Sequence, residues 1–309
     1  MRRGEAVNTL AFMVAPVNTA VALARSSAPL SPRRRAWERL LRNRGALVAL
    51  AVIVLLAAAA VAGPWFSPYG YDDLDYAVQN QSVSRAHWFG ADELGRDLLT
   101  RCCHGARISL AVGIAASLIA LIIGVAYGAV SGYAGGKTDA VMMRLVDVVY
   151  GIPLLLFVIL LMVMFKPGLP LILAALGCVF WLRMARIVRG QTLSIKERDY
   201  VAAARALGSS HARIILRHIL PNTAGPIIVT LTLTVPEAIF SEAFLSLIGL
   251  GVSAPRASLG TLVAEGFSAL ADYPHLFFFP AAVISVLMLA FNFLGDGLRD
   301  ALDPEQVEQ

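Results

Sequence analysis

A glycine-rich stretch, SGYAGGKT at residues 131–138, is the first place in the sequence where chemistry could be expected. It approaches the pattern of a phosphate-binding loop, but Ser131 stands where that pattern requires its first glycine. A phosphate-binding loop also follows a strand and opens a helix, whereas this stretch follows a long apolar segment. The glycines therefore favour a turn between two helices, and any ATP that drives this protein is expected to bind to another subunit.

Cys102, Cys103 and His104 are adjacent and offer metal-ligating atoms. Two neighbouring cysteines cannot easily both reach one ion, and no second Cys/His pair supplies the remaining ligands of a tetrahedral site. His87 and His275 could share the same outer face, but nothing in the sequence brings them together there. We expect no metal and no cofactor in this chain. With three cysteines in all, the sequence also excludes a disulfide framework.

Two acids, Glu237 and Glu242, flank the sequence AIFS near the end of an apolar stretch. Ionisable groups at membrane depth are costly and usually face a bundle interior or water, which favours the lining of a translocation path. Alternatively, the span ends near Val235 and Pro236, and both acids lie in the outer interface of the membrane. Both interpretations stay open. No Ser/His/Asp set and no paired carboxylates stand clear of the apolar stretches, so we expect no enzymatic activity.

These residues lie in an unusually apolar chain. Of its 309 residues, 58% are hydrophobic and 15% are charged, whereas soluble domains carry about 25% charged residues. A helix needs about 20 mainly apolar residues to cross a bilayer, and the uncharged stretches suffice for six such helices. The sequence therefore predicts an all-α membrane protein. Its six transmembrane helices are expected near residues 45–63, 108–130, 148–165, 167–187, 219–240 and 273–295.

Lysine and arginine indicate the orientation of these spans. When the connecting segments are assigned alternately, 20 of these residues lie on one side and six on the other. Because positive residues gather on the cytoplasmic side, both termini are expected in the cytoplasm. They are a basic tail at 1–44, with an amphipathic surface segment at 32–44, and a second tail at 296–309. Topology thus explains the formal net charge of +5, and no nucleic acid is expected as a partner.

Residues 183–221 form the most basic segment between the spans. The sequence predicts an alanine-rich helix capped by Asp199 and ended by Gly208 in the left-handed conformation, then a second helix ended by Pro221. The alanines at 202–204 would leave a small, smooth face that another protein could approach closely. The alternative is a solvated basic loop without a partner, because runs of charge are usually exposed surface.

The stretch YVAAARALGSSHARIILRHILPN resembles the EAA loop of binding-protein-dependent ABC transporter permeases, written E-A-A-x₃-G-x₉-I-x-L-P. In that register Ala202 stands in place of the glutamate and His218 in place of the isoleucine. The remaining positions match the pattern, namely Ala203, Ala204, Gly208, Leu220 and Pro221. The resemblance implies that residues 190–221 are a coupling loop that docks onto an ATPase subunit.

Four further segments are similar to the dipeptide/oligopeptide/nickel branch of these permeases, namely 87–110, 132–153, 242–266 and 294–304. The resemblance implies a type I ABC importer permease fold in a bacterial inner membrane. It also implies as partners a second homologous permease, two cytoplasmic ATPase subunits that bind the ATP, and an extracytoplasmic solute-binding protein. The solute would be a dipeptide, an oligopeptide, glutathione or a nickel complex.

The alternative function is an ATP-independent secondary transporter or channel. Such a protein would need an ion-coupling acid in a discontinuous helix and inverted sequence repeats. Spans one to three and four to six show no evident similarity, and no acid is expected in the middle of a span. Uptake that persists without the ATPases would favour this alternative.

Overall fold

A computed structural model of the chain describes residues 32–165, 168–252 and 255–302. Residues 1–31 of the predicted tail 1–44 and residues 303–309 of the predicted tail 296–309 therefore lie outside the described residues. Within the described part, regular structure is helical apart from an isolated β-bridge between Ala91 and Asp97. The prediction of an all-α fold is confirmed.

Five of the described helices are long and apolar enough to cross a membrane. They are α3 (Arg44–Phe66), α4 (Leu98–Ala134), α7 (Leu169–Ile195), α10 (Ala224–Leu247) and α12 (His275–Leu302). The segment predicted as the third span, 148–165, is divided between α5 (Gly136–Tyr150) and α6 (Leu154–Met164). Pro153 explains the break, because proline lacks a backbone N–H and disfavours helical geometry in the residue before it.

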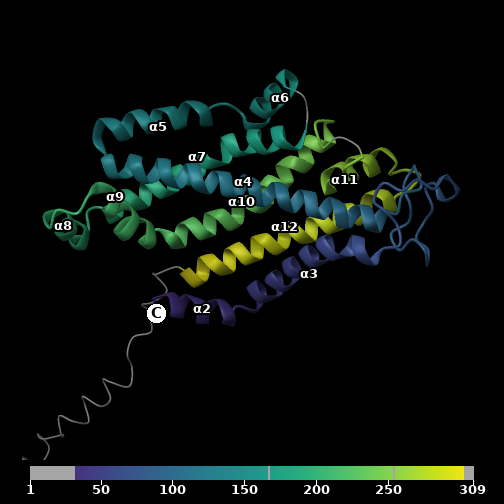
Figure 1. Cartoon of the computed structure of the whole chain (residues 1–309), viewed down its shortest axis with the longest axis horizontal. Coiled ribbons are helices and arrows are strands. Elements are labelled where there is room, and N and C mark those ends of the chain that lie inside the picture. Colours follow the sequence, from purple (N-terminus) through teal and green to yellow (C-terminus); the bar gives the residue numbers. More distant parts are fainter. Residues whose placement is uncertain (1–31, 166–167, 253–254, 303–309) are drawn as a thin grey trace, which may run out of the picture.

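The long helices lie side by side as a bundle, and the short elements gather at its two ends (Figure 1). One end carries α8 (Asp199–Ala206), α9 (His211–Ile214), α2 (Pro32–Arg42) and the last turns of α12. The opposite end carries α6, α11 (Leu259–Ser268) and the connection between α3 and α4. Both ends of the described chain therefore lie at the same end of the bundle as α8 and α9.

Helices α4 and α7 pack closely because a row of glycines in α4 leaves their backbones room to approach. Gly124, Gly128 and Gly132 recur every four residues and so share one face of the helix. A Cβ atom at Gly128 would lie 2.3 Å from the carbonyl oxygen of Ala185. At Gly132 it would lie 2.8 Å from the carbonyl oxygen of Arg189. Small residues at such spacing are typical of helix contacts within membranes.

The start of α4 is fixed by buried polar groups. Asp97 caps the helix by accepting from the backbone N–H of Thr100 at 2.8 Å, and its other oxygen lies 2.9 Å from Nδ1 of His87. The guanidinium of Arg101 is 3% exposed, and it pairs with Asp92 and with Glu265 of α11. These contacts tie the α3–α4 connection and α11 to the start of α4.

The three residues considered as metal ligands each have a different packing partner. Cys102 is buried in an apolar cluster with Leu98 and Leu262. Cys103 lies against Gly63 of α3, and the ring of His104 stacks on that of Tyr71 at 4.1 Å. Their positions are explained by packing between helices.

Candidate functional site

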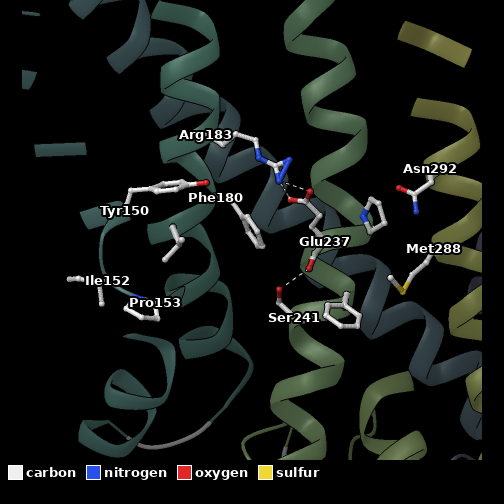
Figure 2. Close-up of a pocket in the computed structure, with 12 residues that line it drawn as sticks. Tyr150, Ile152, Pro153, Phe180, Arg183, Glu237, Ser241, Met288 and Asn292 are labelled. Carbon is white, nitrogen blue, oxygen red and sulfur yellow. Dashed lines mark hydrogen bonds and ion pairs between the residues drawn. The ribbon is translucent and has the colours of Figure 1, made fainter. Parts of the chain in front are cut away.

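A cavity of about 580 Å³ opens between α7, α10, α12 and the break between α5 and α6. Figure 2 shows Arg183 and Glu237 pointing toward one another in its wall, with Met288 and Asn292 of α12 across from them. The volume falls in the range of small-molecule sites. Tyr150, Ile152 and Pro153, at the break between α5 and α6, line one side of it.

The ion pair between Arg183 and Glu237 is the main polar feature of this cavity. Nη2 of Arg183 donates to both carboxylate oxygens of Glu237. The two side chains are 42% and 39% exposed. Glu237 lies about 20 Å along α10 and Arg183 about 21 Å along α7, at a rise of about 1.5 Å per residue, so both are near the middle of their helices.

Helix α10 does not end near Val235 and Pro236, because it continues through Pro236 to Leu247. Proline is tolerated inside a membrane helix where neighbouring groups compensate for its missing N–H. The expectation that no acid lies in the middle of a span is wrong for the same reason. Glu237 lines the cavity, and its place in a translocation path stays a prediction.

Glu242 has a different environment and does not line the cavity. Its side chain is fully buried. Its carboxylate accepts from the hydroxyls of Ser246 at 2.8 Å, Ser258 at 2.6 Å and Ser109 at 3.4 Å. Because Ser258 also caps α11, these bonds hold the start of α11 against α10 and α4.

Two more arginines continue along α7 and pair with acids of α5. Arg186 donates to Asp147 at 2.7 Å. Arg189 donates from Nε and Nη2 to the two carboxylate oxygens of Asp139, both at 2.6 Å. Hydrogen bonding from Arg189 holds the pKa of Asp139 below its ordinary value, and the Ser131 hydroxyl acts in the same direction. The sequence alone does not indicate which acids these arginines meet.

The glycine-rich stretch that approaches a phosphate-binding loop forms the turn between α4 and α5. Gly135 and Gly136 both have positive φ angles, 65° and 53°, which glycine adopts without strain. The hydroxyl of Ser131 donates to Asp139 at 2.6 Å, and Lys196 donates to the carbonyl oxygen of Gly132 at 2.9 Å. The turn predicted from this stretch is thus present, and its polar groups serve packing against α7.

The segment after α7 has the predicted helix–glycine–helix backbone. Gly208 has a φ of 77° and separates α8 from α9, which Ser210 caps by accepting from the N–H of Arg213. Val201 is buried with Ile214 and anchors α8 to α9. The predicted cap at Asp199 is wrong, because Arg198 occupies the capping position and α8 begins at Asp199. An acid in the first turn still interacts favourably with the helix dipole.

The alanine face of α8 is open where the sequence predicted a docking surface. Ala202 and Ala203 are exposed, whereas Ala204 is buried. Leu207, next to Gly208, is 86% exposed and Leu216 is 66% exposed, so the surface is apolar as well as smooth.

The remaining residues of this loop pattern lie just beyond α9. They are His218 in the π-helical turn η2 (Ile215–Ile219), and Leu220 and Pro221 in the 3₁₀ turn η3 (Leu220–Asn222).

Comparison with known proteins identifies the family. Residues 108–307 match the family described as binding-protein-dependent transport system inner membrane component. Residues 31–82 match the N-terminal TM domain of oligopeptide transport permease C. The oligopeptide transport system permease protein OppC of Bacillus subtilis is 48% identical over 95% of this chain and 96% of its own length. The dipeptide transport system permease protein DppC of the same organism is 52% identical over 89% of this chain and 87% of its own length.

Solved structures agree at the level of the fold. A chain of the MetNI methionine ABC transporter in an inward-facing conformation has a TM-score of 0.56 at 19% identity, over 67% of this chain and 96% of that chain. A second crystal form gives a TM-score of 0.53 at 18% identity. The class is therefore that of the multi-pass helical permeases. Within it, the chain belongs to the family of binding-protein-dependent transport system inner membrane components.

Proposed function

We propose that this chain is the permease subunit of an ATP-driven importer that carries dipeptides or oligopeptides across the bacterial inner membrane. The observation that carries the proposal is the 48% and 52% identity to an oligopeptide and a dipeptide permease over most of each chain. The chain itself would hydrolyse no ATP. The side chains of its glycine-rich turn take part in packing between α4, α5 and α7.

The proposed partners follow from the two ends of the bundle and from its cavity. Two ATPase subunits would bind at the cytoplasmic end, where Ala202, Ala203 and Leu207 form an exposed apolar surface on this chain. A solute-binding protein would deliver peptide to the opposite end, and both termini would lie in the cytoplasm. A second, homologous permease would cover the cavity, which opens between helices on one face of the bundle.

The geometry supports a direct mechanical link between these regions. Helix α7 carries Arg183 of the cavity wall and ends at Ile195, which packs in one apolar cluster with Val201 of α8. Closure of the ATPases would displace α8 and α9, and α7 would pass that displacement to the cavity. The transporter would then alternate between inward-open and outward-open states, each favoured by the ligands bound to the other subunits.

The test is uptake of a labelled tripeptide by proteoliposomes containing the two permeases, the ATPases and the binding protein. We expect uptake only with ATP inside and the binding protein outside. Uptake by the permeases alone, without ATPases, would instead establish the secondary transporter or channel. A carrier of glutathione or of a nickel complex would take up that solute under the same conditions and leave the tripeptide outside.

A further inference from the structure

The guanidinium of Arg183 retains binding capacity inside the cavity. Of its five N–H donors, only those on Nη2 are used, and both bonds go to Glu237. Nε and Nη1 hydrogen-bond to no group in the described part of the chain. The carboxylate of Glu237 likewise accepts hydrogen bonds from Arg183 alone among the described residues, although two oxygens can accept about four.

The rest of the cavity is mainly apolar and offers little that could distinguish one side chain from another. Phe180, Phe240 and Met288 line it, and methionine adapts its shape to varied neighbours. A solute held here would therefore be recognised by its charges and tolerated in its apolar parts. The two charges in the wall are adjacent and of opposite sign, so they match a solute that carries both signs itself.

We propose that Arg183 binds the terminal carboxylate, and Glu237 the terminal ammonium, of a peptide in transit. This inference rests on the proposed function and adds the groups of the peptide that the permease recognises. Every unmodified peptide carries both termini, whereas its side chains vary. One ion pair in an apolar wall would thus accept many sequences and still require a peptide backbone with free ends.

The adjacency of the two side chains sets a length dependence. An extended peptide spans at most about 3.3–3.6 Å per residue, so a dipeptide spans about 7 Å. A peptide of two or three residues can reach Arg183 and Glu237 together, whereas the termini of a longer extended peptide must engage them one at a time. Removal of either charge should therefore affect short peptides most.

The test is saturation-transfer NMR, which detects weakly bound ligands directly. The sample is the permease–ATPase complex in lipid nanodiscs, without the binding protein. The ligands are trialanine, N-acetyl-trialanine and trialanine amide. Glu237→Gln keeps an oxygen that can accept from Arg183. We expect it to weaken trialanine binding about tenfold, since hydrogen bonds to charged groups contribute that much. N-acetyl-trialanine binding should change less than about twofold, by the same reasoning. Arg183→Gln should likewise weaken trialanine binding about tenfold and change the binding of trialanine amide less than about twofold.

Asp147→Asn is the matched control, because it removes an ion pair of α7 that does not line the cavity. It should leave all three ligands unchanged. A purely structural ion pair would make Glu237→Gln weaken free and acetylated trialanine equally, and that result overturns the inference. Absence of saturation transfer to trialanine in the unaltered complex overturns it as well. The proposed function is tested separately by ATP-dependent tripeptide uptake, and it survives either result if that uptake is present.

Discussion

Arg189 of α7 and Asp139 of α5 form a two-bond ion pair, and the Ser131 hydroxyl of α4 donates to the same carboxylate. Three helices are thus joined at one acid, close to the turn that leads into α5. Lys196 adds a fourth contact, from the end of α7 to the carbonyl oxygen of Gly132. This cluster holds the last turns of α4 and α7 and the first turn of α5 together beside α8.

Asp139→Asn should lower the stability of the isolated permease by about 1–3 kcal/mol, because Arg189 and Ser131 lose their charged acceptor. The pKa of Asp139 is depressed, so the ionised carboxylate stabilises the folded state above the ordinary aspartate pKa of about 3.9. This stabilisation is lost as pH falls through the lower, folded-state pKa. Thermal unfolding in detergent should show a difference between variant and parent that is constant near neutral pH and shrinks below about pH 4. A difference that grows on acidification would contradict the assignment.

Gly128→Ala should destabilise the bundle, because its new Cβ would lie 2.3 Å from the backbone carbonyl oxygen of Ala185 and must force α4 away from α7. Gly190 of α7 is the matched control, since a Cβ there meets no atom within 4 Å. Gly190→Ala should be neutral or stabilise by up to about 1 kcal/mol through helix propensity. Unfolding of both variants by denaturing detergent measures the difference. Equal effects would show that the glycine row does not set the α4–α7 distance.

Ser258→Ala should loosen α11, because the hydroxyl both caps this helix and donates to the buried Glu242. Loss of the cap alone is worth about 0.5–2 kcal/mol. Hydrogen–deuterium exchange should rise in the backbone of residues 259–268 and stay unchanged in α7. Ser268→Ala is the control at the other end of α11, where the hydroxyl is exposed and makes one weak contact of 3.4 Å. Similar exchange in the two variants would show that the Ser258 hydroxyl does not hold α11 in place.

Ala203→Asp should disrupt binding of the ATPases while leaving the permease folded, because Ala203 is exposed on α8 and touches no buried cluster. Gly208→Asp should have a larger effect, since its φ of 77° is strained for residues other than glycine. Co-purification of the ATPases and ATP-dependent uptake are the measurements. Thr138→Asp changes an exposed residue at the same end of the molecule, and the ATPases should co-purify normally with this variant. Full assembly and uptake with both loop variants would contradict the proposal that residues 190–221 couple the permease to the ATPases.

The sequence predicted the long helices because each carries an uncharged stretch, and that signal is local. It also predicted the positive φ of Gly208, since glycine ends helices in that conformation. The third span was harder to predict, because hydropathy over 148–165 is continuous and does not register the break before Leu154. Composition identifies apolar residues, whereas the break depends on the backbone geometry around Pro153, which precedes α6.

The partners of the charged residues could not be predicted, because they lie far apart in the sequence. Arg183 meets Glu237 54 residues later, and Ser109 meets Glu242 133 residues later. Both acids were candidates from their position alone, but their roles are separated by packing of α10 against α7 at Glu237 and against α4 and α11 at Glu242. The environment of Glu237 is a cavity, while that of Glu242 is a cluster of serine hydroxyls.

Helix α4 has 37 residues and is about 55 Å long, whereas the apolar core of a bilayer is about 30 Å thick. It is therefore a rigid helix longer than the apolar core of the membrane. Asp97 holds it at one end and Ser131 at the other. The glycine row holds α4 close against α7, so we expect the two helices to move together. A rotation of about 5° about its Asp97 end would move its Ser131 end by about 5 Å at that length. A small change of angle at the α11 end of the bundle thus becomes a displacement of several ångströms at the end that carries α8 and α9.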